Sequence, residues 1–231
     1  MNKILLEDNS SLKDLDLVED AVIIISNISD PVNIHINKNI NVFTLITDCS
    51  FDLNLFINKD SSFSIFSVNT SINVRIDLLK SGIKFNYSYS TINDIHNNYK
   101  VDINHFGKNI TSKIVNHGIS LNNSKLSFVI NTIVPKNVTG VNTNQDSKII
   151  IFGDNNATIK PNLLVDNDDI EANHAAYIGR LKKEDLFYLM SRGINLKDAE
   201  GLLVKSFLLG NMDISFEERE IVLNNIKKYW R

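Results

Sequence analysis

The sequence is poor in the residues that cross-link a chain or turn it sharply. It has one cysteine, Cys49, with three prolines and nine glycines among 231 residues. A single cysteine excludes a disulfide framework within the chain, and any metal cage made of cysteines from one chain. The pairs Asn-Gly and Asp-Gly, on which two-residue hairpin turns rely, occur nowhere. This lack of hairpin signals argues against an up-and-down meander of strands.

Long apolar runs and an excess of one charge are also missing. The run AVIII at 21–25 is far shorter than the roughly 18 residues of a membrane span. The start, MNKILLEDNSSLKD, lacks the apolar stretch of about 7 to 15 residues that a secretory signal requires. The formal net charge of −3 provides no basic field for nucleic acid. We therefore expect a soluble, cytoplasmic protein without membrane or nucleic-acid partners.

Asparagine is the abundant residue, with 33 copies, of which 29 precede His174. Such an excess fits the codon usage of an AT-rich genome. Asparagine also tolerates left-handed backbone conformations and forms side-chain turns. We expect it to occupy many tight corners.

From about residue 20 to 174, apolar residues recur with a period of two. The alternation is clear in VNIHI (32–36), FDLNLFI (51–57), SINVRIDLL (71–79) and IKFNYSY (83–89). These segments are short, rich in β-branched and aromatic side chains, and bounded by Asn, Asp, Ser and Lys. Steady strand spacing without hairpin turns favours a solenoid of stacked strands. No exact repeat can be aligned, so a β-sandwich stays open as an alternative.

After about residue 181 the apolar period becomes that of a helix. KKEDLFYLM carries Leu186, Leu189 and Met190 as a stripe that we expect to be buried, and Gly193 is expected to end this helix and serve a structural role. The chain thus divides into a lead-in (1–20), a β-solenoid core (21–179) and a helical domain (180–231).

Capping signals predict two further helices. Asn195 with Asp198 would open one that ends at Gly210, and Ser215 with Glu218 would open the next. Three helices within about 50 residues cannot bury their apolar faces alone. They must dock on the β region or on another protein.

Catalytic motifs are missing from the sequence. There is no glycine-rich phosphate loop, no Gly-x-Ser-x-Gly elbow and no His-Glu-x-x-His pair. Two of the five histidines end apolar rows of a strand. His105 is expected to be a hydrogen-bonded structural residue. His174 is either that or a neutral imidazole that offers a nitrogen to iron or another transition metal.

Asp168 and Asp169 form an acidic pair shortly before His174. They are either a solvated corner between two strands or, beside an imidazole, carboxylates suited to ferrous iron. One histidine cannot hold a metal by itself. If His174 is a ligand, other ligands have to come from a second subunit or a transient substrate.

The run LLVDNDDIEANHAAYIGRLKKEDLFYLMSRGI (163–194) resembles the closing signature of the SufB/SufD family, core subunits of the SUF iron–sulfur cluster assembly machine. In that family an acidic pair after a strand leads to a histidine among small residues, then to a glycine and two helices. The matching positions are Asp168–Asp169, His174–Ala176, Gly179, Leu186–Leu189, Ser191–Ile194, Leu202, Leu203 and Phe207. Weaker similarity extends upstream to SINVRIDLLKSG (71–82), INHFGKNITSK (103–113) and GVNTNQDSK (140–148).

The resemblance implies a right-handed parallel β-helix followed by a small helical domain, and a non-enzymatic scaffold. SufB-like members carry a functional cysteine in the β region, whereas this chain has none after position 49. His174 matches the histidine of SufD-like members, which is implicated in building the nascent cluster. The resemblance therefore implies a SufD-like chain with a nascent-cluster or iron site at His174, Asp168 and Asp169. No cofactor would be stably bound, and iron or a cluster would be held transiently at a subunit interface.

Two partners are implied. The end of the β-helix would pair with a SufB-like paralogue, and the C-terminal helices would form the platform for the ATP-binding-cassette ATPase SufC. The residues expected to contact the ATPase are Leu186, Phe187, Tyr188, Arg192, Leu202, Leu203 and Phe207.

This chain departs from the family pattern in places. Ala172 stands where many relatives have cysteine, and Ala175 stands where they have glycine. Family members are typically longer, with a helical domain before the β region, so we expect a shortened SufD. Two alternatives stay open: a homodimeric scaffold with SufC, and a carbohydrate-active β-helix enzyme, which would need a groove of paired carboxylates.

Overall fold

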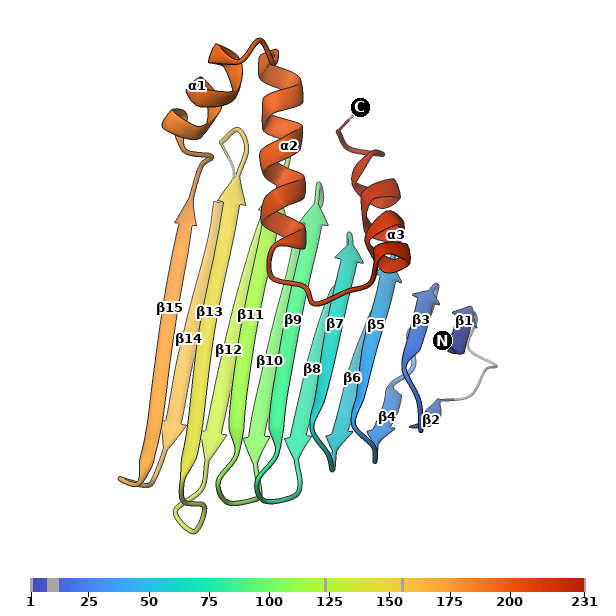
Figure 1. Cartoon of the computed structure of the whole chain (residues 1–231), viewed down its shortest axis with the longest axis vertical. Helices are drawn as coiled ribbons and strands as arrows, with labels where there is room; N and C mark the ends of the chain where they lie inside the picture. The colour runs from blue at the N-terminus through green and yellow to red at the C-terminus, as the bar shows by residue number, and fades with distance from the viewer. Residues whose placement is uncertain (1, 8–12, 123, 155, 231) are drawn as a thin grey trace.

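The chain folds as a flattened parallel solenoid followed by three helices (Figure 1). The computed structural model describes residues 2–7, 13–122, 124–154 and 156–230. Within these residues, fifteen strands alternate between an eight-stranded and a seven-stranded sheet, and every pair of neighbouring strands is parallel. The predicted β-helix with C-terminal helices is confirmed, and a sandwich of antiparallel strands is not what forms.

The eight-stranded sheet consists of β1 (Asn2–Glu7), β3 (Ala21–Ser26), β5 (Ile40–Thr47), β7 (Ser61–Val68), β9 (Lys84–Asn93), β11 (Thr111–Ser120), β13 (Val141–Ile151) and β15 (Ile170–Gly179). The seven-stranded sheet consists of β2 (Asp14–Leu17), β4 (Val32–Ile36), β6 (Ser50–Ile57), β8 (Ser71–Leu78), β10 (Asn97–His105), β12 (Lys125–Val134) and β14 (Asn156–Val165). The helices are α1 (Lys183–Ser191), α2 (Leu196–Leu209) and α3 (Phe216–Ile226).

Strand pairing begins inside the segment that was expected to be a lead-in. β1 pairs along its whole length with β3, from Asn2 opposite Ala21 to Glu7 opposite Ser26. β2 adds only four residues to the other sheet. β1 (NKILLE) lacks the period-two alternation, and β2 is too short to show it clearly. Residues 8–12 of that segment lie outside the described ranges.

Successive coils of the solenoid become longer toward the C-terminus. Residues paired across neighbouring strands are 21 positions apart at Ala21 and Val42, but 31 apart at Thr111 and Asn142. The early coils turn at equivalent left-handed residues, Asn27, Asp48 and Asn69, which have φ near +50°. These residues are spaced by 21 positions, as the early coils are. The changing coil length explains why no single repeat could be aligned. Of the five non-glycine residues with positive φ in the described chain, four are asparagines, as expected for tight corners.

The main core fills the space between the two sheets. Inward side chains stack from coil to coil, as Ile34, Leu55 and Ile76 do, all fully buried. Burial of such aliphatic side chains stabilises the fold by roughly 1.5 to 3 kcal/mol each. Because every coil contributes to the same stack, the interior is continuous along the solenoid.

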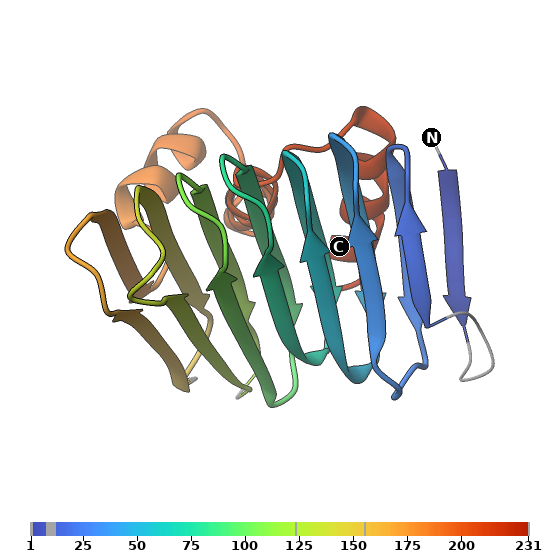
Figure 2. The same ribbon diagram turned by 90° about the horizontal axis from the view of Figure 1, so that it is seen from below.

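The outer face of the eight-stranded sheet is apolar and is covered by α2 and α3, which lie on one side of the solenoid (Figure 2). Phe43 and Phe66 of the sheet belong to the same buried cluster as Val204, Leu208 and Val222 of the helices. Because β3 and β5 are buried on both faces, they are nearly continuous in apolar residues, whereas β7 is fully buried but places small serines between its apolar side chains. The outer face of the other sheet is polar and carries ladders of side-chain amides such as the bond from Asn54 to Asn33, 2.9 Å long.

The helix boundaries follow the predicted capping signals. Gly193 has φ +86°, and its N–H donates to Met190 O while Ile194 N–H donates to Leu189 O, which together close α1 in a Schellman motif. The Asn195 side chain accepts from Asp198 N, 2.9 Å away, and opens α2.

The two remaining helix-boundary predictions are also confirmed. Gly210 is the C-cap of α2, in an ordinary right-handed conformation, so it ends the helix without needing positive φ. Ser215 and Glu218 form a reciprocal capping box at the start of α3.

The expected burial of the α1 stripe is wrong. α1 has no buried residue; Leu186 and Leu189 are half-buried and Met190 is 45% exposed. The physical reason is position: α1 lies beyond the last strand, while α2 and α3 occupy the apolar face of the sheet (Figure 1). None of the helices in the described residues is long and apolar enough to cross a membrane.

Candidate functional site at the open end of the solenoid

The solenoid ends in two edge strands. β15 is the last strand of the eight-stranded sheet and pairs only with β13, and β14 is the last strand of the seven-stranded sheet and pairs only with β12. Both strands are largely exposed, and Leu164, Tyr177 and Ile178 are 42% to 55% exposed. Exposed edges with apolar side chains are the type of surface to which another chain can add strands.

His174 lies in the middle of β15, on the inner face of this last coil. Its register partner is Gln145, which is fully buried inside the solenoid. Successive side chains of a strand alternate between faces, so Ala172 and Ala176 share the inner face with His174. Their methyl groups leave room around the imidazole, which is exposed because no further coil covers it.

The interior of the solenoid becomes polar as it approaches His174. Whereas the early coils stack aliphatic residues, the last coils bury hydrogen-bonded polar side chains. Asn116 Nδ2 donates to Ser147 Oγ over 3.0 Å, and Gln145 Nε2 donates to Thr132 Oγ1. Buried polar groups persist only when they have partners or a role, so this composition marks the last coils as different from the first.

His105 ends β10 and is fully buried. Its Nδ1 lies 3.2 Å from Ile133 O, and its Nε2 lies 3.0 Å from Ser112 Oγ, which is 2.8 Å from Thr143 Oγ1. Burial lowers the pKa of His105 from 6.5 to about 4, against a smaller opposing effect of the Ile133 carbonyl. A neutral imidazole with a partner at each nitrogen is the geometry expected of a structural histidine.

Asp168 and Asp169 lie at the turn between β14 and β15 and are exposed. With Gly140 and Glu171 they line a shallow pocket of about 290 Å³. A strand rises by about 3.3 Å per residue, so Asp169 and His174 are roughly 16 Å apart along the chain. The pair therefore does not meet the imidazole, and the described residues contain no group of three or more His, Cys, Asp or Glu side chains placed to hold a metal.

The helical residues expected to contact an ATPase divide into two groups. Phe187, Tyr188 and Leu202 are 75%, 59% and 46% exposed, and the Arg192 guanidinium lies 5.4 Å from the centre of the Tyr188 ring. The other members, Leu186, Leu203 and Phe207, are half-buried. The exposed group thus leaves apolar side chains of α1 and of the middle of α2 uncovered by the rest of the described chain.

Comparison with known proteins identifies the family. The model of the SufBD core domain, described as SUF system FeS cluster assembly, matches residues 57–207, which is well over half of the chain. This chain belongs to the SufBD family.

Individual SufBD proteins match over shorter stretches. The chain is 35% identical over 114 residues to the iron–sulfur cluster assembly protein SufD of Bacillus subtilis, covering 48% of this chain and 26% of that protein. It is 36% identical over 104 residues to the SufBD family protein ycf24 of Galdieria sulphuraria, covering 45% of this chain and 47% of the other. A 48-residue match to SufD of Escherichia coli reaches 44% identity, over 21% and 11% of the two chains. The matches thus span less than half of each relative.

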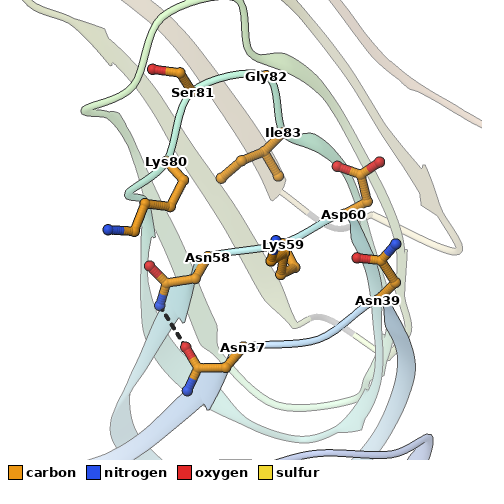
Figure 3. Close-up of a pocket in the computed structure, with 9 residues that line it drawn as sticks. All are labelled: Asn37, Asn39, Asn58, Lys59, Asp60, Lys80, Ser81, Gly82 and Ile83. Atoms are coloured by element: carbon orange, nitrogen blue, oxygen red, sulfur yellow. Dashed lines mark hydrogen bonds between the residues drawn. The ribbon is translucent and has the colours of Figure 1, made fainter.

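A polar hollow elsewhere on this SufBD protein bears on the alternative of a carbohydrate-active enzyme. Three stacked turns of the early coils enclose about 800 Å³, lined by Asn37, Asn39, Asn58, Lys59, Asp60, Lys80, Ser81, Gly82 and Ile83 (Figure 3). Asp60 is the only acid among them, and its Oδ1 accepts from Lys84 N. A glycosidase requires a pair of carboxyl groups. The hollow does not supply one.

Sequence reasoning missed two residues that the SufBD fold places opposite the site or against its helices. His117 stacks on Phe207 at 4.2 Å, and its Nδ1–H donates to Phe207 O over 2.7 Å, which fastens the end of α2 to the sheet. Burial lowers the pKa of His117. Gln145 lies opposite His174 because of the register of β13 with β15, which no local sequence pattern reveals.

Proposed function

We propose that this chain is a SufD-like, non-catalytic scaffold subunit of a cytoplasmic SUF iron–sulfur cluster assembly complex. In this proposal its open end pairs with a SufB-like paralogue, its C-terminal helices bind the SufC ATPase, and the nascent cluster is the cargo. The observation that carries the proposal is the open end itself. Two parallel sheets of a SufBD family chain stop together at strands that each have one free edge, with His174 on the inner face.

The edge strands supply the means of pairing. Backbone N–H and C=O groups on the free sides of β14 and β15 can continue both sheets into a partner, which gives an extended interface without new side-chain chemistry. Such pairing would cover Leu164 and Ile178 and would place His174 between two subunits. Ligands missing from this chain would then come from the partner, with His174 as one donor to iron or the cluster.

The helices supply the means of coupling to ATP. α2 is fixed to the solenoid by packing and by bonds from Ser90 and His117 to its last carbonyls, so force applied to α1 and α2 would reach the sheet that ends at β15. Closure of two ATPase copies would thus twist the junction of the two scaffold subunits and expose buried groups. The chemical energy comes from the ATPase, while this chain contributes geometry and one ligand.

The test is capture of the assembly with this chain as bait, co-expressed with a SufB-like protein and an ATP-binding-cassette ATPase. We expect a complex whose mass contains all three, and an iron–sulfur absorption band after reconstitution. His174→Ala should leave the mass of the complex unchanged and lower its cluster content by about tenfold or more. Removing only the hydrogen-bond partner of a metal ligand typically costs about tenfold or more in metal affinity, and removing the ligand itself should cost at least as much.

His96→Ala is the control, because His96 is an exposed histidine on the turn between β9 and β10. It should affect neither mass nor cluster. Failure of the three chains to associate would overturn the scaffold assignment, and a mass with two copies of this chain and no SufB-like protein would show a homodimeric scaffold instead. Equal cluster content in wild type and His174→Ala would remove His174 from the site.

A further inference from the structure

A row of lysines runs along the edge of the solenoid where strands of the seven-stranded sheet lead into the next strands of the eight-stranded sheet. The last paired residues of β4, β6 and β8 are Ile36, Ile57 and Leu78, which are in register with one another. Two positions beyond each of them is a lysine, and the same holds beyond Val134 of β12. In the coil between, the corresponding residue is Gly107, and a lysine follows it. The row consists of Lys38, Lys59, Lys80, Lys108 and Lys136, all of them exposed.

Contacts between successive turns keep this register outside the strands. Asn58 Nδ2 donates to Asn37 Oδ1 over 2.8 Å (Figure 3). Gly107 packs so closely on the backbone of Lys80 that a Cβ atom there would overlap it. The row covers four steps between neighbouring coils of about 4.8 Å each, so it is straight and roughly 19 Å long.

The charge of this lysine row is not compensated within the described chain. None of its five members forms an ion pair with a described residue. Lysines on the strands differ: Lys100 and Lys148 are paired with Asp102 and Asp146, at 2.8 and 2.7 Å. Cations about 4.8 Å apart are well within the screening length of about 10 Å at 0.1 M salt, so they repel one another. A row of this kind is therefore a local cationic field in a chain whose formal net charge is −3.

The polar hollow at the early turns adds neutral donors to two of these lysines. Lys59 and Lys80 line its volume of about 800 Å³, together with Asn58 and Ser81 (Figure 3). The one acid in that lining, Asp60, already accepts from a backbone N–H at 2.9 Å. The hollow thus offers ammonium, amide and hydroxyl groups, which are donors for carboxylate or phosphate oxygens.

Apolar side chains beside the row favour a protein segment over nucleic acid as the source of these oxygens. Leu79 and Phe106 are neighbours in register and are 36% and 51% exposed. Phe106 is the only aromatic residue in the turns that carry the lysines, whereas single-stranded nucleic acid requires a series of aromatic platforms for its bases. A nucleic acid duplex requires a broad basic surface rather than a single row. An extended peptide rises by about 3.3 Å per residue, so about six residues would cover the row.

We propose that the lysine row binds an extended acidic segment of another protein. Carboxylates of the segment contact the ammonium groups, and an apolar side chain of the segment packs on Leu79 and Phe106. The row lies along the turns, away from the free edges of β14 and β15 and from the helices. This inference therefore does not rest on the proposed function.

The experiment is a fluorescence anisotropy titration of the full chain against a labelled peptide of about ten residues, made of glutamates around two central leucines. We expect binding that weakens as salt is raised from about 50 to about 200 mM. The triple variant Lys38→Gln, Lys59→Gln and Lys80→Gln should weaken binding about tenfold, because each exposed ion pair contributes a small factor and three are removed together.

The matched control is the triple variant Lys113→Gln, Lys125→Gln and Lys160→Gln, which removes the same charge from exposed lysines outside the row. It should change the affinity by less than about twofold. Equal losses in the two triple variants would overturn the proposal, as would failure of the wild type to bind the peptide. Tighter binding of a labelled oligouridylate of the same length, or of phosphatidylserine vesicles, would also overturn it by assigning the row to nucleic acid or to a membrane surface.

Discussion

At the scale of single residues, three histidines show how surroundings decide what one side chain does. His105 is enclosed in the interior with a partner for each nitrogen, His117 fastens a helix to a sheet, and His174 lies uncovered at the open end. Burial lowers the pKa of His105 and of His117, so both imidazoles are neutral at neutral pH. His174, by contrast, is exposed to solvent. The same residue type is therefore enclosed by hydrogen-bonded structure in two places and is exposed in the third.

His105 should make the stability of the fold depend on pH. Its pKa is about 4 in the fold and 6.5 in the unfolded chain, so the unfolded chain binds the proton first as pH falls. The stabilisation is complete above about pH 6.5 and is lost progressively toward pH 4, by at most about 3 kcal/mol. Urea unfolding at pH 7.5 and pH 5 measures this loss.

The His105→Ala variant separates this effect from other titrations. At pH 7.5 we expect its free energy of unfolding to fall by about 1 to 3 kcal/mol, because Ser112 and the Ile133 carbonyl lose a partner. Its stability should also vary less between pH 7.5 and 5 than that of the wild type, with a remainder due to His117. His96→Ala should behave as the wild type does; an unchanged pH dependence in His105→Ala would contradict the assignment.

At the scale of elements, α1 differs from the other two helices in what its apolar side chains touch. α2 and α3 bury Val204, Leu208 and Val222 against the sheet, whereas α1 has no fully buried residue and presents Phe187 and Tyr188 to solvent. The Schellman motif at Gly193 closes the C-terminal end of this helix, whereas its N-cap, Lys182, makes no side-chain capping bond. An ordered helix with an uncovered apolar face is suited to a partner.

Phe187→Ala should weaken binding of the SufC-like ATPase without reducing the stability of the chain. An aromatic anchor at an interface contributes about 2 kcal/mol or more, which corresponds to roughly thirtyfold in Kd. The control is Phe216→Ala at the start of α3, because both phenylalanines are 75% exposed. Titration calorimetry with the purified ATPase distinguishes them, and equal losses for the two variants would show that α1 is not the docking element.

At the scale of the whole molecule, the solenoid has two ends and only one is proposed to pair with another scaffold subunit. β1 ends the eight-stranded sheet on one side, and β14 and β15 end both sheets on the other. Leu5 on β1 and Leu164 on β14 have nearly the same exposure, 54% and 55%. Both ends thus expose a leucine. They differ in strand length and in the residues of the nearby interior, which are aliphatic in the first coils and more polar in the last.

Leu164→Lys should lower assembly with the SufB-like partner, because a lysine on an edge strand opposes pairing with a second sheet. Leu5→Lys introduces the same charge at the opposite end and should leave assembly unchanged. Analytical ultracentrifugation of each variant with the partner measures the effect. A loss of assembly confined to Leu5→Lys would place the interface at the N-terminal end of the solenoid.

Particular residues show how far prediction from the sequence reached. The alternation of Val32, Ile34 and Ile36 predicted an inward row, and the caps at Asn195 and Ser215 predicted helix starts, because both signals are local. The exposure of Met190 was not predictable in this way. An amphipathic stripe indicates that a helix can pack against an apolar surface. The position of the helix relative to the sheet decides whether it does.

The candidate site likewise has features that the local sequence reveals and features that only strand pairing reveals. The run around His174 was enough to place the chain in its family, because the motif is contiguous in sequence. The place of Gln145 opposite His174 depends on strand register, which joins residues 29 positions apart. Coils of unequal length hide that spacing from any search for repeats.

The sequence by itself determined short strands with alternating faces, three helices with their capping residues and a family motif, since alternation, capping and contiguous motifs are properties of neighbouring residues. Only the tertiary structure decided which faces are covered, that α1 is left uncovered, and that both sheets stop together beside His174. These outcomes depend on register and on competition between helices for one apolar face, and both are settled by contacts between residues that are distant in the chain.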